Sequence, residues 1–99
     1  MKYEPKPLPF RKQLIGISEK TMQIHHDKLY VGYVNKLNEI EEKLATADRS
    51  LANATYSEYG ELKREESFAA NGIFLHEYYF NVLGGEGNQG GALVKAIEA

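Results

Sequence analysis

Two long segments without proline are the features that most constrain the fold of this chain. The first runs from about Ser18 to Ala45, and its apolar side chains recur at steps of three, four or seven residues, which is the spacing of one face of an α-helix. These side chains are Met22, Leu29, Tyr33, Leu37, Ile40 and Leu44. The segment therefore predicts a helix of roughly 27 residues, about 40 Å long, and Ser18 is placed to cap its N-terminus.

The second segment, from about Tyr56 or Ser57 to Leu83, shows the same helical spacing. Its apolar stripe consists of Leu62, Ala69, Ile73, Phe80 and Leu83. Gly84 and Gly85 follow directly and are typical of a helix end. Small polar residues fill 46–55 between the two segments. Because this connection is short, we expect the two helices to form an antiparallel hairpin in an all-α fold.

Both ends of the chain differ from the hairpin. Prolines at positions 5, 7 and 9 exclude a helix and predict an extended N-terminal arm. Leu8 and Phe10 are placed to pin this arm onto a neighbouring helix. A glycine-rich loop follows at 84–91, and residues 92–99 predict a short C-terminal helical segment without a stop signal. We therefore expect the chain to be cut off at this point rather than finished.

Composition excludes several classes of function. The twelve basic and fourteen acidic residues are well mixed and give a net charge of −2, so no clustered basic face marks a nucleic-acid binder. The absence of cysteine excludes disulfides and thiolate metal ligands. Residues 1–15 lack the apolar core of a signal peptide, and no stretch reaches the length of a membrane span. We expect one soluble, cytoplasmic domain over residues 1–99, with no nucleic-acid or membrane partner.

Several apolar residues lie off the two helical stripes and predict a protein partner. These residues are Tyr30, Val34, Phe74, Leu75 and Tyr78. A lone hairpin buries one stripe per helix, and this additional apolar surface is too large for a free face. The partner is either another copy of the chain or a missing second domain. We favour a homo-oligomer, because helical hairpins readily pair into multi-helix assemblies.

Three histidines are the candidates for chemistry. His76 falls in the middle of the apolar stripe of the second helix, where an imidazole must satisfy both ring nitrogens or lose its charge. On the first helix, His26 lies closer to the centre of the stripe and His25 about 70° to one side, so geometry does not choose between them. Tyr33 lies on the same stripe, where a buried hydroxyl needs a partner. Such histidines either pack as hydrogen-bonded core residues or bind a metal, and the residues alone leave both interpretations open.

Two short motifs do not support other chemistries. The run HEYYF at 76–80 lacks the second histidine of the zinc-protease signature HExxH. The glycine-rich loop at 84–91 has no GK[ST] sequence and does not follow a strand, so it predicts a hinge between domains rather than a phosphate site.

Four segments together resemble the iron/manganese superoxide dismutase family. The run HHDKLYVGYVNKLN at 25–38 closely resembles the family's first long helix. The LPF at 8–10 resembles its N-terminal Leu-Pro-Tyr segment, and HEYYFNVLGG at 76–85 resembles its second helix. The final GGALVKAIEA at 90–99 resembles the start of the linker to the family's C-terminal α/β domain. The resemblance covers essentially the whole chain.

This resemblance implies a site and a reaction. The family holds one iron or manganese ion with three histidines, one aspartate and a bound solvent molecule. The first ligand is the histidine eight residues before a tyrosine, which implies His25 rather than His26, and His76 corresponds to the second ligand. Tyr33 corresponds to the tyrosine that joins the solvent hydrogen bonds and narrows the channel for superoxide. The metal cycles between trivalent and divalent states, oxidising one superoxide to oxygen and reducing the next to hydrogen peroxide.

The chain departs from the family pattern at several positions. Leu29 replaces a channel histidine that contacts the partner subunit, Leu75 an asparagine, and Phe80 a tryptophan. Gly72 stands where iron-type members carry a solvent-binding glutamine, which favours manganese over iron. The family's aspartate and third histidine belong to a downstream motif that the 99 residues do not contain.

Two hypotheses about function follow. In the first, the chain is the N-terminal hairpin domain of a superoxide dismutase and is catalytically incomplete without the C-terminal half. In the second, it is a truncated helical module that self-associates and binds a metal through His25 and His76. A symmetric dimer of such modules offers four imidazoles to one ion.

Overall fold

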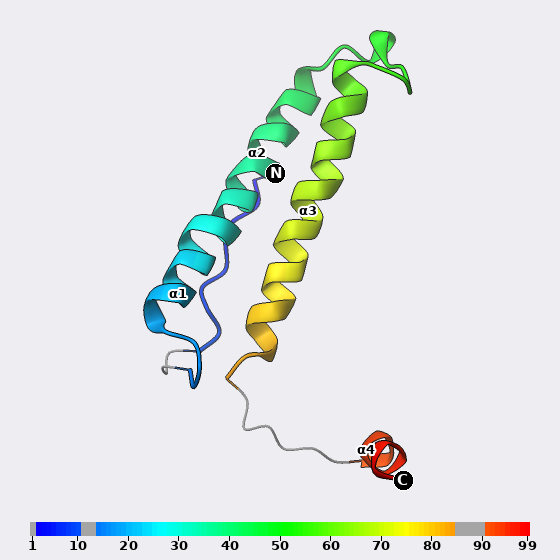
Figure 1. Cartoon of the computed structure of the whole chain (residues 1–99). Helices are drawn as coiled ribbons and strands as arrows, with labels where there is room; N and C mark the ends of the chain where they lie inside the picture. Colours follow the sequence, from blue (N-terminus) through cyan, green and yellow to red (C-terminus); the bar gives the residue numbers. More distant parts are fainter. Residues whose placement is uncertain (1, 11–13, 85–90) are drawn as a thin grey trace.

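The computed structural model describes residues 2–10, 14–84 and 91–99, and the regular structure in these residues is entirely helical. Two long helices lie side by side and antiparallel (Figure 1). The first is continuous but has three parts: α1 (Glu19–Ile24), a π-helical turn η1 (His25–Tyr30) and α2 (Val31–Thr46). The connection contains a 3-10 turn, η2 (Arg49–Leu51), and the second long helix is α3 (Glu58–Val82). The predicted all-α hairpin is confirmed.

Serine side chains begin both long helices. The Ser18 hydroxyl oxygen accepts a hydrogen bond from the N–H of Thr21 at 3.1 Å, and that of Ser57 accepts one from the N–H of Gly60 at 3.0 Å. Both are N-cap arrangements, which satisfy backbone donors that the first helical turn leaves open. Ser57 is buried and also donates to the carbonyl of Asn53 at 3.0 Å. The predicted N-cap at Ser18 is confirmed, and Ser57 ties the connection to α3.

The C-terminal part of the structure agrees with the predicted order of elements. Gly84 follows α3 with a φ of 78°, the left-handed conformation that makes glycine a common helix stop. Gly85 and residues 86–90 of the predicted loop lie outside the described residues. The short helix α4 (Gly91–Glu98) makes no contact with the hairpin in the described chain (Figure 1). No helix among the described residues combines the length and apolar character needed to cross a membrane.

The π-helical turn changes which face of the first helix is buried. A π turn bonds five residues back instead of four, so it holds one extra residue and rotates the positions that follow. Uniform α-helical spacing predicted Leu29 on the buried stripe and Tyr30 and Val34 off it. Leu29 is in fact 54% exposed, whereas Tyr30 is 1% and Val34 0% exposed. The prediction that Tyr30 and Val34 need an external partner is therefore wrong, because the π turn places both in the core.

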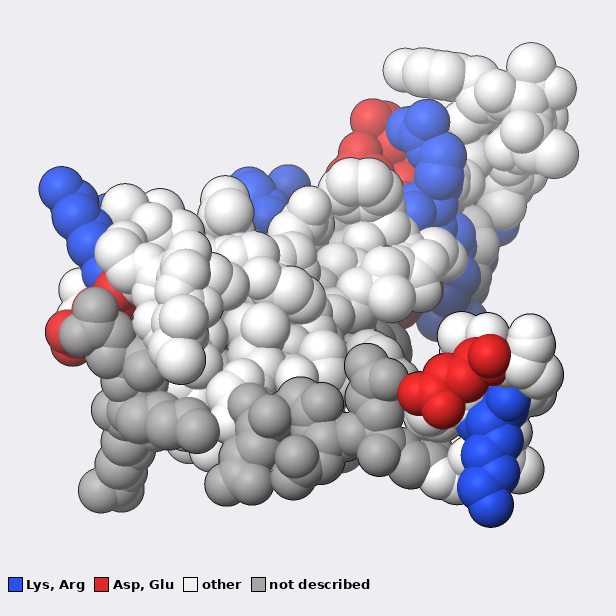
Figure 2. Space-filling view, turned by 60° about the horizontal axis from the view of Figure 1, so that its bottom comes forward, with Lys and Arg blue, Asp and Glu red and all other residues white. Residues whose placement is uncertain are grey.

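The other apolar residues that were predicted to lie outside the core are exposed. On α3, Phe74 is 57%, Leu75 69% and Tyr78 71% exposed. Figure 2 shows a face on which uncharged surface extends broadly between charged side chains near its margins. These three exposed apolar side chains all lie on α3.

Two hydrophobic clusters hold the hairpin together. The arm-side cluster contains the buried residues Met22, Tyr30, Val34, Ile73 and Phe80. The connection-side cluster contains Ile40, Leu44, Leu62 and Ala69. Leu8 and Phe10 pack against the arm-side cluster, as predicted, and the arm runs along the hairpin from the start of α1 toward the middle (Figure 1). The arm therefore covers the half of the hairpin that carries the histidines.

Candidate metal centre

His25 and His76 lie next to each other on the two long helices. Their ring centroids are 4.9 Å apart and their planes differ by 86°, an edge-to-face arrangement. The His25 ring also packs against Tyr79, at 5.3 Å, and Phe80, at 5.4 Å. Both imidazoles line a pocket of about 170 Å³ together with Leu75 and Tyr79. The structure thus brings two predicted ligand residues to one opening.

A backbone contact determines which nitrogen of the His76 ring carries the hydrogen when the ring is neutral. Its Nδ1 lies 2.6 Å from the carbonyl oxygen of Gly72. A carbonyl oxygen only accepts, so Nδ1 must be the donor, and the lone pair of the neutral ring lies on Nε2. Metal-binding histidines are commonly oriented in this way, by donation of the second ring N–H to a carbonyl. The contact therefore fits His76 to a metal through Nε2.

His26 points to a different neighbour. Its Nε2 lies 2.7 Å from the carbonyl oxygen of Lys6, and its Nδ1 lies 2.8 Å from a carboxylate oxygen of Asp27. The arm therefore engages His26, while the adjacent His25 faces His76. Helical periodicity alone favoured His26 for the centre of the stripe; the geometry favours His25 as the partner of His76.

Tyr33 packs beside the histidine pair in a gap left by a glycine. Its ring centroid is 5.4 Å from that of His76 and 6.0 Å from that of Phe68. A Cβ atom built on Gly72 would lie 2.6 Å from the Tyr33 ring. Gly72 lies one helical turn before His76, and the Tyr33 ring fills the room that its missing side chain leaves.

The electrostatics of the pair suit a metal ligand. Burial, and then the neighbouring His76, lower the pKa of His25 below its ordinary value of 6.5. A histidine with a lowered pKa stays neutral over a wider pH range, and the neutral ring is the form that binds a metal. In the described part of the chain, no group of three or more His, Cys, Asp or Glu side chains could hold a metal ion. These residues therefore fit a metal as two ligands of an incomplete set.

A hydrogen-bonded network that the sequence analysis missed joins the arm to both long helices. It consists of Tyr3, Lys6, Tyr30 and Glu77, and is called the arm network below. One carboxylate oxygen of Glu77 accepts from the hydroxyl of Tyr3 at 2.5 Å and from that of Tyr30 at 2.7 Å. The other lies 3.3 Å from the ammonium group of Lys6. Nearby, the side-chain amide of Asn38 exchanges two 2.8 Å hydrogen bonds with the backbone of Tyr3.

The arm network shifts the pKa values of its members. Burial would raise the pKa of Glu77, but hydrogen bonds from Tyr3, Tyr30 and Lys6 outweigh it and lower that pKa. Burial and the hydrogen bond to Glu77 raise the pKa of Tyr3 to about 12. Burial also raises the pKa of Tyr30 to about 12, against the opposing hydrogen bond from the Lys6 N–H. One feature of the sequence could have pointed to this network: Glu77 is a charged residue at helical spacing from Ile73 and Phe80, two residues of the apolar stripe.

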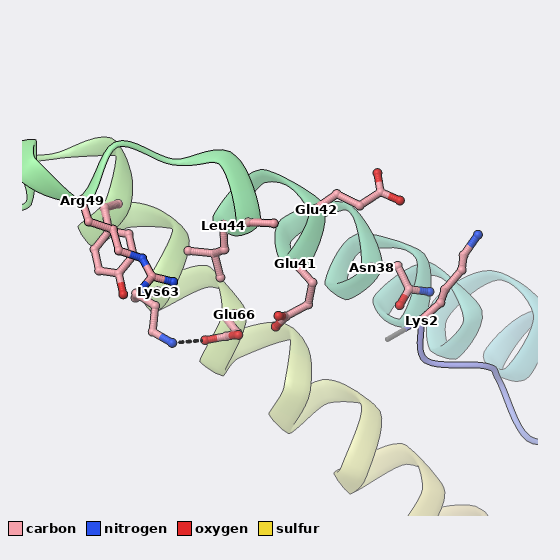
Figure 3. A pocket seen from close by; sticks show the side chains of 10 residues that line it. Lys2, Asn38, Glu41, Glu42, Leu44, Arg49, Lys63 and Glu66 are labelled. Atoms are coloured by element: carbon pink, nitrogen blue, oxygen red, sulfur yellow. Dashed lines mark hydrogen bonds and ion pairs between the residues drawn. The ribbon is translucent and has the colours of Figure 1, made fainter.

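A larger pocket of about 520 Å³ lies near the connection, between α2 and α3 (Figure 3). Glu41 and Glu66 point toward each other there, and Lys63 forms an ion pair with Glu66 at 2.6 Å. A hydrogen bond with Glu66, and then burial, raise the pKa of Glu41, whereas hydrogen bonds with Glu41 and Lys63 lower that of Glu66. The proximity of the two carboxyl groups thus moves their pKa values in opposite directions. The described lining contains no histidine, so this pocket is separate from the candidate metal centre.

Comparison with known proteins identifies the family of the chain. Residues 2–84 match the family model described as iron/manganese superoxide dismutases, alpha-hairpin domain. The superoxide dismutase [Fe] of Aquifex pyrophilus is 51% identical over 98% of this chain and 48% of its own length, and that of Aquifex aeolicus is 50% identical over the same shares. The mitochondrial superoxide dismutase [Mn] of Eptatretus stoutii is 37% identical over 83% of this chain and 56% of its own length.

The matches extend over nearly the whole chain, although the chain spans about half the length of the iron relatives it matches. The family model covers both long helices and most of the arm, which are the elements that bring His25, Tyr33 and His76 together. On these matches, the chain belongs to the iron/manganese superoxide dismutases and carries the alpha-hairpin domain of that family.

Proposed function

We propose that this chain supplies His25 and His76 as two ligands of an iron or manganese site that dismutates superoxide. The observation that carries the proposal is the pair of imidazoles 4.9 Å apart on facing helices, with Nδ1 of His76 engaged by the carbonyl of Gly72. Iron and manganese supply the one-electron exchange that conversion of superoxide to oxygen and hydrogen peroxide requires.

The residues around the pair have separate tasks. The Gly72 carbonyl holds the His76 ring so that its Nε2 lone pair is available to the ion. The Tyr33 ring packs against His76 and fits over Gly72, and its proposed task is to join the solvent hydrogen bonds of the site through its hydroxyl. The aromatic ring of Tyr79 packs against His25 and lines the opening, which limits the water around the histidines.

The remaining ligands are proposed to come from outside the hairpin. Two imidazoles leave the coordination of iron or manganese incomplete. We propose that residues 1–99 act as one hairpin domain and that a C-terminal domain of the same protein completes the site. The two Aquifex relatives are named as iron proteins, whereas Gly72 favoured manganese in this chain. The preference for manganese stays a prediction, and so does the cytoplasmic localisation.

The experiment combines metal analysis with a superoxide assay on the purified chain, mixed with a C-terminal fragment of a relative. We expect activity only in the mixture, and a loss of more than about 100-fold in His25→Ala and in His76→Ala. Glu39→Ala is the control, because it removes a carboxylate that pairs with Lys36 and Lys43 on α2, away from the histidine pair. Full activity of the 99 residues alone, or full metal content in His25→Ala, would contradict the proposal.

A second candidate is a self-associating helical module that binds a metal through the same two histidines. The exposed apolar residues Leu75, Tyr78 and Val82 at helical spacing on α3 favour it. In a symmetric dimer the two histidine pairs would share one ion, so metal analysis separates the proposals: this candidate requires one ion for two chains without any added fragment.

A further inference from the structure

Lys6 joins the N-terminal arm to both ends of the π-helical turn η1. Its backbone N–H donates to the hydroxyl of Tyr30 at 3.0 Å, and its carbonyl oxygen lies 2.7 Å from Nε2 of His26. Because a carbonyl oxygen only accepts, His26 is the donor. His26 is the second residue of η1 and Tyr30 the last. One residue of the arm therefore holds the turn near its start and at its end.

Glu77 holds Lys6 in this position. Its carboxylate lies 3.3 Å from the Lys6 ammonium group and accepts a hydrogen bond from the Tyr30 hydroxyl. The oxygen of that hydroxyl in turn accepts the hydrogen bond from the Lys6 N–H. It also accepts the hydroxyl of Tyr3, further along the arm. The Glu77 side chain is only 13% exposed, and hydrogen bonds to a buried charged group are among the stronger ones. Glu77 is thus the residue of α3 that receives the hydrogen bonds and the ion pair of the arm.

The π turn needs such support. Isolated π turns are rare because their hydrogen bonds are poorer than those of an α-helix, and tertiary contacts must hold the extra residue in place. His25 is the first residue of η1, so the turn sets the direction of its ring relative to His76. If η1 relaxed to an α-helix, the positions that follow would rotate and Tyr30 would leave the core.

We propose that Glu77 is a positioning residue for His25: it fastens the arm, and the arm maintains the π turn that faces His25 toward His76. The inference rests on the proposed function only for the identity of these two histidines as ligands. Glu77 itself acts through Tyr3, Lys6 and Tyr30 and does not touch the metal.

Amide hydrogen exchange of the metal-free chain tests this inference, with Glu77→Ala as the main variant and Glu77→Gln as the conservative one. In Glu77→Ala we expect exchange at the arm amides and across η1 to rise roughly tenfold or more, the effect of losing hydrogen bonds to a charged group. The NMR cross-relaxation between the His25 and His76 rings should weaken in parallel. Glu77→Gln keeps one acceptor oxygen and should restore part of both signals.

Two control variants separate positioning from general stability. Glu39→Ala removes a carboxylate that pairs with Lys36 and Lys43 on the exposed side of α2, and should leave η1 unchanged. Leu44→Ala weakens the connection-side cluster and so lowers global stability without touching the arm. If Glu77→Ala does not fold, Tyr3→Phe takes its place, because it removes one hydrogen-bond donor to the same carboxylate. The same changes in amide exchange and ring contact are expected, but smaller.

Three results would overturn the inference. The arm amides could lose protection in Glu77→Ala while η1 and the ring contact stay as they were. The arm amides could keep their protection, so that Glu77 does not hold the arm. Leu44→Ala, compared at equal loss of stability, could reproduce the change in η1. None of these measurements involves a metal, so failure here leaves the proposed function standing, and failure of metal binding leaves this inference standing.

Discussion

At the scale of single residues, Gly72 shows how closely the candidate site is packed. It supplies the carbonyl that orients His76, and the absence of its side chain admits the Tyr33 ring. The sequence does not reveal that Tyr33 packs over Gly72, because the two residues lie on different helices and only the fold brings them together.

Replacing Gly72 by alanine is predicted to destabilise the chain by about 1–3 kcal/mol. The new Cβ atom would lie 2.6 Å from the Tyr33 ring, and this overlap outweighs the helix propensity that alanine gains. Gly32→Ala is the matched control, since a Cβ there meets nothing within 4 Å, and it should stabilise by up to about 1 kcal/mol. Urea denaturation measures both, and equal effects of the two substitutions would contradict the packing argument.

The tyrosines of the arm network predict an alkaline transition. The pKa values of Tyr3 and Tyr30 are raised from 10.0 to about 12 in the folded chain. A raised folded pKa contributes stability that is complete below pH 10 and is lost as the pH rises through about 12. Ring-carbon NMR titration should show both hydroxyls ionising near pH 12. Glu77→Gln should bring both pKa values part of the way down toward 10.0, because burial, the larger cause, remains. Unchanged pKa values in that variant would show that Glu77 contributes nothing to the shift.

At the scale of elements, local chemistry was enough to predict the ends of both long helices. It was not enough to predict which face of the first long helix is buried. Serine caps and a glycine stop act over a few residues, so Ser18 and Gly84 could be read from the sequence. A π turn is stabilised by contacts from distant segments, here the arm, and uniform helical spacing cannot reveal it. This one inserted residue explains why Leu29 was predicted inside and Tyr30 outside.

The two N-caps are predicted to differ in their contribution to stability. Ser57 is buried and bonds to Asn53 as well as to the N–H of Gly60, whereas Ser18 is exposed. Ser57→Ala should therefore cost about 2 kcal/mol and Ser18→Ala about 1 kcal/mol or less. Thermal unfolding followed by circular dichroism measures the difference, and a larger loss in Ser18→Ala would contradict it.

At the scale of the whole molecule, the hairpin leaves apolar side chains of α3 uncovered among the described residues. Residue patterns correctly predicted Phe74, Leu75 and Tyr78 as exposed, because α3 has uniform helical spacing throughout. What covers this face is a property of chains or domains outside the hairpin, and sequence patterns within it cannot supply the answer.

If a second copy covers α3, the purified chain should associate with increasing concentration. Replacing Tyr78 and Val82 together by lysine should weaken this association by about tenfold or more, because both are exposed and one helical turn apart. Leu51→Lys is the control, since Leu51 is 70% exposed but lies in the connection. Sedimentation velocity measures the association, and a chain that stays monomeric at every concentration would contradict this form of the assembly.

The central claim is that His25 and His76, and not His26, provide the metal ligands of this chain. Titration of the chain with Zn²⁺, a redox-inert probe that favours imidazole nitrogen, tests it most directly when the imidazole nitrogen shifts of all three histidines are followed by NMR. We predict that the nitrogens of His25 and His76 shift together, with Nε2 as the binding atom of His76, while His26 keeps its shifts. A joint shift of His26 and His76, or no joint shift of any pair, would contradict the claim.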